Sequence, residues 1–77
     1  MDKMEKLLEI INVIQQNRNR DLISELKITD HLSNDLGLES LDLAELTVRL
    51  EAEYDVDIFE EEIVLTVKDV IEKLNNE

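Results

Sequence analysis

The hydrophobic residues recur with the spacing of amphipathic helices in three parts of the chain. Apolar positions three or four residues apart run from Asp2 to about Gln16, and again from Ser40 to Asp55. A third run extends from Val67 to about Asn75, and Thr66 before it, with Asp69 three residues later, is typical of a capping box. The pattern therefore predicts three helices with these bounds.

The predicted helix after Ser40 carries apolar residues on two opposite faces. The face expected in the core consists of Leu43, Leu46, Leu50 and Tyr54. The opposite face, which we call the contact stripe, consists of Leu41, Ala44, Val48 and Ala52. A small monomer has no reason to bury both faces, so we expect the contact stripe to be an exposed docking surface with an acidic rim. The alternative is a helix enclosed on both faces within the core.

Two segments connect the predicted helices. The first, residues 17–39, is long for a loop without structure of its own, so we expect its apolar residues to pack back onto the helices. These residues are Leu22, Ile23, Leu26, Ile28 and Leu32. The second begins as a loop at 55–57 and continues into a predicted short helix over 58–63. The expected fold is all-α, a small antiparallel four-helix bundle with a long first loop and a short third helix, in one domain over 1–77.

Ser40 lies where the first connection turns into a helix. The residues 34–37 before it are turn formers, and Gly37 can adopt a positive φ without steric cost. Ser40 is a candidate N-cap, although the residue three positions on is Leu43, not the Glu or Gln of a capping box. The alternative is a modification site, because a helix N-terminus suits a phosphate group. The residue type alone leaves both interpretations open.

The sequence around Ser40 resembles a known family. Residues 35–42 read Asp-Leu-Gly-Leu-Glu-Ser-Leu-Asp, followed by Glu-Leu at 45–46 and Leu-Glu-Ala-Glu-Tyr at 50–54. This arrangement is similar to the signature of acyl carrier proteins, whose Asp-Ser-Leu motif bears 4′-phosphopantetheine on the serine. The chain departs from the pattern at Glu39, where the family usually has Asp, and on the helix surface at Arg49 and Ala52.

The resemblance implies a cofactor, partners and a set of site residues. Ser40 would carry covalent 4′-phosphopantetheine, and the partners would be a phosphopantetheinyl transferase and acyl-loading and acyl-processing enzymes with basic docking patches. The implied partner-binding residues are Glu39, Leu41, Asp42, Ala44, Glu45, Val48 and Glu51. An acyl chain would slip past Leu46, Leu50, Phe59 and Ile63.

Acidic residues dominate the charge of the chain, whose net charge is −12. Residues 34–62 hold eleven acids and one base, so this stretch carries −10 and the remainder −2. Such a field repels nucleic acid and anionic membranes and steers basic protein surfaces toward itself. A merely solubilising surface is the alternative, but the clustering around Ser40 favours docking.

The sequence offers little material for catalysis or metal binding. It has no cysteine, and its one histidine, His31, stands in a predicted loop without the context of a nucleophile elbow. The Asp-rich start at residue 55 lacks the Gly and Glu that a calcium-binding EF-hand loop requires at its sixth and twelfth positions, so we expect no metal site. Weak surface binding of Ca²⁺ or Mg²⁺ by the acidic clusters is the alternative. No apolar run approaches membrane-spanning length, and we expect a complete, soluble, cytoplasmic monomer without membrane insertion.

These observations favour a non-catalytic carrier. It would hold acyl intermediates as thioesters on a phosphopantetheine arm at Ser40 for fatty acid, polyketide or another specialised acyl pathway. The alternative is an unmodified acidic helical module that binds a basic partner through the same contact stripe. A Ser40→Ala substitution separates the two hypotheses, because it abolishes function only in the first.

Overall fold

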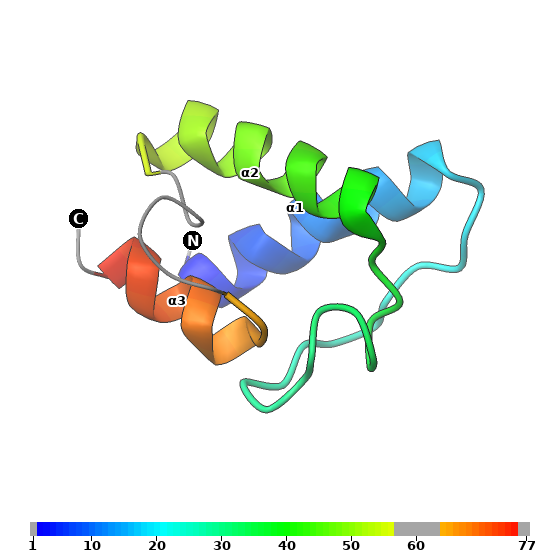
Figure 1. The fold of residues 1–77 in the computed structure, drawn as a ribbon, viewed down its shortest axis with the longest axis horizontal. Helices are drawn as coiled ribbons and strands as arrows, with labels where there is room; N and C mark the ends of the chain where they lie inside the picture. Colours follow the sequence, from blue (N-terminus) through cyan, green and yellow to red (C-terminus); the bar gives the residue numbers. More distant parts are fainter. Residues whose placement is uncertain (1, 57–63, 76–77) are drawn as a thin grey trace.

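The computed structural model describes residues 2–56 and 64–75, and within these ranges it contains three helices and no strand. Helix α1 spans Lys3–Asn17, α2 spans Ser40–Tyr54 and α3 spans Val67–Asn75. Helix α2 lies along α1 and runs in the opposite direction, while α3 lies beside the N-terminal part of α1 (Figure 1). The all-α class and these three helices are confirmed. The short helix predicted over 58–63 lies outside the described residues, so a four-helix bundle is not established.

Local capping interactions fix the starts of α1 and α3. The Asp2 carboxylate caps α1 by accepting a hydrogen bond from the Glu5 N–H at 2.9 Å. At α3, the Thr66 hydroxyl accepts from the Asp69 N–H at 3.2 Å, and the Asp69 carboxylate accepts from the Thr66 N–H at 3.1 Å. This reciprocal pair is the capping box that the sequence predicts, and it satisfies two backbone donors that the helix leaves unpaired.

One hydrophobic core joins the three helices. Leu46 and Leu50 of α2 are fully buried, as their spacing predicts, whereas Leu43 and Tyr54 are only partly buried at its edge. The buried apolar residues are Leu7, Ile10, Ile11, Ile14, Leu32, Leu38, Leu46, Leu50, Val64, Val67, Val70 and Leu74. Within the described parts of the chain, no helix is both long and apolar enough to cross a membrane.

The connection between α1 and α2 is tied to the helices at several points. The Asn12 side chain of α1 makes two hydrogen bonds to the backbone of Ile23, at 2.7 and 2.9 Å. Further along, an isolated antiparallel bridge joins His31 to Thr66. Of the apolar residues expected to pack inward, Leu32 is buried, and Ile23 and Leu26 are partly buried against the core.

The prediction is wrong for Leu22 and Ile28, which are 62% and 53% exposed. At Ile28 the backbone carbonyl accepts from the Lys68 N–H at 3.0 Å, so the segment is held by its main chain while the side chain remains in solvent.

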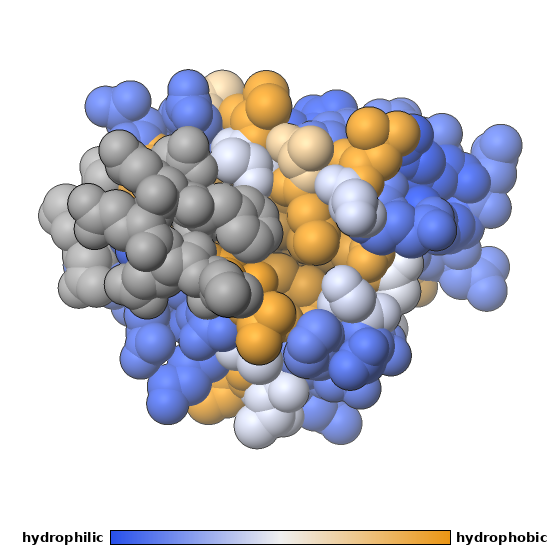
Figure 2. Space-filling model, in the orientation of Figure 1, coloured by the Kyte–Doolittle hydropathy of each residue, from blue (hydrophilic) through white to orange (hydrophobic). Residues whose placement is uncertain are grey.

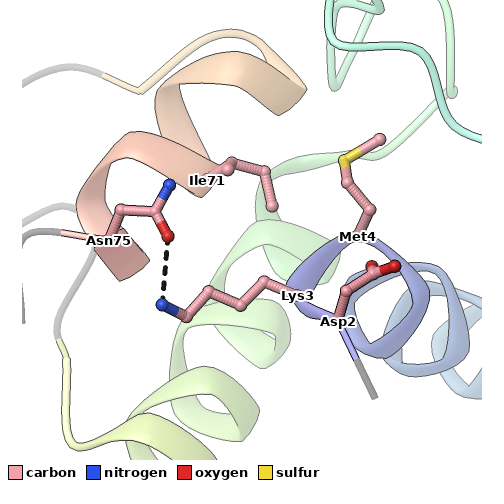
Figure 3. Close-up of a pocket in the computed structure, with 5 residues that line it drawn as sticks. All are labelled: Asp2, Lys3, Met4, Ile71 and Asn75. Carbon is pink, nitrogen blue, oxygen red and sulfur yellow. Dashed lines mark hydrogen bonds between the residues drawn. The ribbon is translucent and has the colours of Figure 1, made fainter.

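The two ends of the described chain meet beside an open cavity of about 540 Å³. Its lining includes Met4 of α1 and Ile71 of α3, and the Lys3 ammonium group donates a hydrogen bond to the Asn75 side-chain oxygen at 3.0 Å (Figure 3). This contact joins the first turn of α1 to the last turn of α3.

Candidate functional site

Ser40 is the first residue of α2, and its side chain is exposed. Gly37 before it has φ 77°, the left-handed conformation that the sequence predicts for this turn. Leu38 follows and is 2% exposed, so it anchors the end of the connection in the core. The chain therefore enters α2 from a fixed point, with Ser40 at the surface.

The N-cap of α2 is Glu39, and the expectation that Ser40 is the cap is wrong. The Glu39 carbonyl accepts the first helical hydrogen bond from the Leu43 N–H at 2.9 Å. The Asp42 carboxylate, three residues after the cap, accepts a hydrogen bond from the Glu39 N–H at 2.8 Å. The cap is thus one residue earlier in the sequence than Ser40. The Ser40 hydroxyl makes no hydrogen bond among the described residues.

Asp42 is the centre of an ion-pair cluster that joins this helix start to the end of α1. The Asp42 side chain is 1% exposed. The Arg18 Nε lies 2.9 Å from Asp42 Oδ1, and the Arg20 Nη2 lies 2.7 Å from Asp42 Oδ2. With the Glu39 N–H, these groups supply the donors that a buried carboxylate needs.

The charges around Asp42 keep its carboxylate ionised. Burial acts to raise the pKa of Asp42, but the hydrogen bonds from the Glu39 N–H and from Arg20 and Arg18 outweigh it. The pKa of Asp42 therefore lies below its ordinary value of 3.8.

The burial of Asp42 corrects its predicted role in partner binding. A carboxylate that is 1% exposed and bonded on both oxygens cannot form salt bridges with another protein. Glu45 is also engaged, since one oxygen lies 3.2 Å from Arg18 Nη2 and the other lies 2.9 Å from Arg49 Nη2. The acidic rim predicted beside Ser40 is thus largely paired within the molecule.

The contact stripe is exposed, as its spacing predicts. Leu41 and Val48 are each 67% exposed, and Ala44 and Ala52 are also exposed. Hydrophobic residues lie at the surface among hydrophilic ones in the part of Figure 2 where α2 runs. Leu41 follows Ser40 directly, so the stripe begins beside the candidate modification site.

The predicted acyl-binding residues, unlike those of the contact stripe, are not exposed where the structure describes them. Leu46 and Leu50 lie in the core with no exposed area. Phe59 and Ile63 lie outside the described residues. The acyl pocket therefore stays a prediction.

A comparison with protein families identifies the class of this site. The family model described as a phosphopantetheine attachment site matches residues 9–74. The chain belongs to the phosphopantetheine attachment site family. Domains of this family are non-catalytic carriers of covalent 4′-phosphopantetheine, so the chain is a carrier protein and interacts with a phosphopantetheinyl transferase and with acyl-processing enzymes. The matched region contains Ser40 and the whole of α2.

Sequence reasoning on this carrier domain missed the roles of Arg18 and Arg20. Both lie in a polar break between predicted helices, 24 and 22 residues before Asp42, and no spacing rule connects them to it. The available signal was the pair of bases in a chain with twenty acids and only eight bases.

Metal binding has no candidate in 2–56 and 64–75, where no group of three or more His, Cys, Asp or Glu side chains is arranged to hold an ion.

Proposed function

We propose that Ser40 is the residue to which 4′-phosphopantetheine is attached in this carrier protein. The observation that supports it is the exposed Ser40 hydroxyl, which takes no part in capping because Glu39 and Asp42 cap the helix. The phosphodiester would lie at the N-terminus of a 15-residue helix, where backbone N–H groups and the helix dipole favour negative charge. When bound, the arm supplies a terminal thiol that holds the cargo as a thioester.

Attachment is a phosphoryl transfer from coenzyme A. The Ser40 oxygen forms a bond to phosphorus as a pyrophosphate P–O bond of coenzyme A breaks. Adenosine 3′,5′-bisphosphate leaves, and the hydroxyl proton passes to the transferase. What this chain supplies is the position of the hydroxyl, which Leu38 in the core and the Asp42 cluster hold in place.

The partners of the carrier would dock on the contact stripe. Leu41, Ala44 and Val48 offer apolar contact beside Ser40. Glu39, the N-cap of α2, and Glu51 within α2 are exposed acids in the same region. Weak charge-assisted contact of this kind lets each partner associate and leave quickly. We propose that residues 1–77 form one domain that acts as a cytoplasmic monomer in fatty acid, polyketide or another specialised acyl pathway.

Intact mass spectrometry tests the attachment. The protein is incubated with coenzyme A and a broad-specificity phosphopantetheinyl transferase, beside the variants Ser40→Ala and Ser24→Ala. Ser24 is a matched control, because it is another exposed serine, in the connection between α1 and α2. We expect one phosphopantetheine on the native chain and on Ser24→Ala, and none on Ser40→Ala.

A mass gain that persists in Ser40→Ala would contradict the proposed site. The absence of any gain on the native chain would contradict the carrier proposal at Ser40 and favour an unmodified acidic interaction module.

A further inference from the structure

Glu45 on α2 is paired on both of its carboxylate oxygens. Arg18 Nη2 lies 3.2 Å from Glu45 Oε1. Arg49 approaches the other oxygen, Oε2, with Nε at 3.0 Å and Nη2 at 2.9 Å. Glu45 and Arg49 are four residues apart with the acid first, the order that favours a pair on a helix surface. The carboxylate nearest the middle of the contact stripe is therefore neutralised from within the molecule.

The two ends of the contact stripe consequently differ in available charge. At the Ser40 end, Asp42 is buried, Glu45 is doubly paired, and Glu39 is exposed but lies 3.7 Å from Arg20 Nη2. At the other end, Glu51 is exposed and forms no ion pair with any described residue. A basic partner that approaches Ser40 meets acids whose charge is already balanced by arginines.

We infer that Arg49 masks Glu45 and so weakens the docking of basic partners at the Ser40 end of the contact stripe. This inference rests on the proposed function, since it assigns a specificity role within the same docking surface. A lysine or arginine of a partner has to displace Arg49 before it reaches Glu45 Oε2. Arg18 holds the other oxygen, so loss of Arg49 leaves Glu45 in place with Oε2 free.

Chemical labelling of carboxylates tests the mask without any partner. A carbodiimide couples a small amine to accessible carboxylates, and peptide mass spectrometry then gives the labelling rate of Glu45, with exposed Glu51 as the internal reference. We expect Glu45 to be labelled about threefold faster in Arg49→Ala than in the native chain, in line with the strength of exposed ion pairs. Arg49→Gln, which keeps the aliphatic stem, serves as the second variant. Equal rates in native and variant chains would overturn the inference.

Transferase kinetics test the consequence for docking. With saturating coenzyme A and a broad-specificity phosphopantetheinyl transferase, we expect Arg49→Ala to lower the KM for the carrier by up to about fivefold at low salt, with kcat unchanged. The difference should shrink as ionic strength rises, because salt screens exposed charges. A KM that stays the same or increases would overturn the inference.

Two comparisons separate masking from a general change in charge. Lys27→Ala also removes one positive charge, from a residue in the connection before α2 that forms no ion pair among the described residues, and it should leave KM nearly unchanged. In a Glu45→Gln background, the effect of Arg49→Ala should disappear, because the group that it unmasks is gone. An equal fall in KM for Lys27→Ala, or a persistent effect in the Glu45→Gln background, would contradict masking.

The two proposals fail in different ways. A native chain that gains no mass contradicts the proposed function, while the labelling rate of Glu45 still decides whether Arg49 masks it. A native chain that is modified, with Arg49→Ala matching it in labelling and in KM, refutes the masking role alone.

Discussion

The first turns of α2 and α3 both have backbone N–H groups without partners inside the helix, and different side chains accept their hydrogen bonds. In each, an aspartate three residues after the cap accepts the cap residue's N–H, Asp42 from Glu39 at 2.8 Å and Asp69 from Thr66 at 3.1 Å. At α3 the hydroxyl of Thr66 is itself the cap. At α2 the cap is one residue earlier than Ser40, so the serine hydroxyl is left exposed. A shift of one residue thus decides whether a hydroxyl serves the helix or is available for modification.

The two aspartates also differ in what surrounds them. Asp69 is partly exposed and accepts hydrogen bonds from the backbone N–H groups of Leu65 and Thr66. Asp42 is buried and pairs with Arg18 and Arg20, which belong to the end of α1 and the following connection. The start of α3 is therefore capped by its own side chains, while backbone hydrogen bonds from the Val67 and Lys68 N–H groups to the Asp30 and Ile28 carbonyls, at 2.9 and 3.0 Å, tie it to the connection. The start of α2 differs in that its capping aspartate itself pairs with side chains from a distant part of the chain.

Among the variants that test this difference, Asp42→Asn should lower the free energy of unfolding the most. It removes the charge that compensates two guanidinium groups and weakens the bond to the Glu39 N–H. Loss of one partner from a buried ion pair costs about 3–5 kcal/mol, and since both arginines are partly exposed we expect about 2–3 kcal/mol from urea unfolding. Hydrogen exchange at the Glu39 amide should also accelerate.

Asp21→Asn is the matched control, because Asp21 is an exposed aspartate whose side chain forms no ion pair among the described residues. We expect it to change the free energy of unfolding by less than about 0.5 kcal/mol. An equal loss in the two variants would show that the buried cluster does not stabilise the start of α2.

Acid should destabilise both helix starts. Hydrogen bonds from the Leu65 and Thr66 N–H groups lower the pKa of Asp69. At Asp42 burial acts to raise the pKa, but the hydrogen bonds that Asp42 accepts outweigh burial and lower it. Both pKa values lie below the ordinary 3.8. A carboxylate with a lowered folded-state pKa stabilises the protein above its unfolded-state pKa, and this stabilisation is lost as the pH falls through the folded-state pKa.

The free energy of unfolding should therefore decline as the pH falls below about 4, and Asp42→Asn and Asp69→Asn should each make that decline shallower. Urea titrations at a series of pH values measure it. Slopes parallel to that of the native chain in both variants would mean that neither carboxylate is linked to folding.

Thr66→Ala should have a smaller effect, confined to α3. It deletes the hydroxyl that accepts from the Asp69 N–H, and loss of an N-cap side chain costs about 1 kcal/mol. Thermal unfolding followed by circular dichroism measures the change. Thr66→Ser keeps the capping oxygen and should recover most of the stability, so a Ser variant as unstable as the Ala variant would point to packing as the cause.

Ser40→Ala should have the smallest effect on stability. Because the Ser40 hydroxyl makes no hydrogen bond among the described residues, we expect a change of less than about 0.5 kcal/mol under the same conditions. A loss of about 1 kcal/mol, equal to that of Thr66→Ala, would indicate that Ser40 caps the helix in solution.

Much of the fold could be predicted because its causes are local in sequence. The helix predicted from Asp2 to about Gln16 is found at Lys3–Asn17, and the one predicted from Val67 to about Asn75 is found with those bounds. Apolar periodicity and capping act within three or four residues, so a sequence displays them directly. Exposure of the contact stripe followed from the same periodicity, since one helix cannot bury two opposite faces in so small a core.

The charge distribution around Ser40 could not be predicted in the same way. Asp42 and Glu45 were expected to be a free acidic rim because 34–62 holds one base among eleven acids. The structure brings Arg18 and Arg20 to Asp42 from outside that stretch. Counting charges along the chain does not reveal such pairings, because they depend on how the end of α1 packs against α2.

The sequence by itself determined the helices, the turn before Ser40, the exposed contact stripe and the resemblance to phosphopantetheine carriers, because each depends on residues that are neighbours along the chain. Only the tertiary structure decided that Glu39 rather than Ser40 ends up as the cap, that Asp42 is buried, and that arginines balance the acids beside the serine. These features depend on contacts between groups up to 27 residues apart, and side-chain chemistry alone does not specify which distant charges meet.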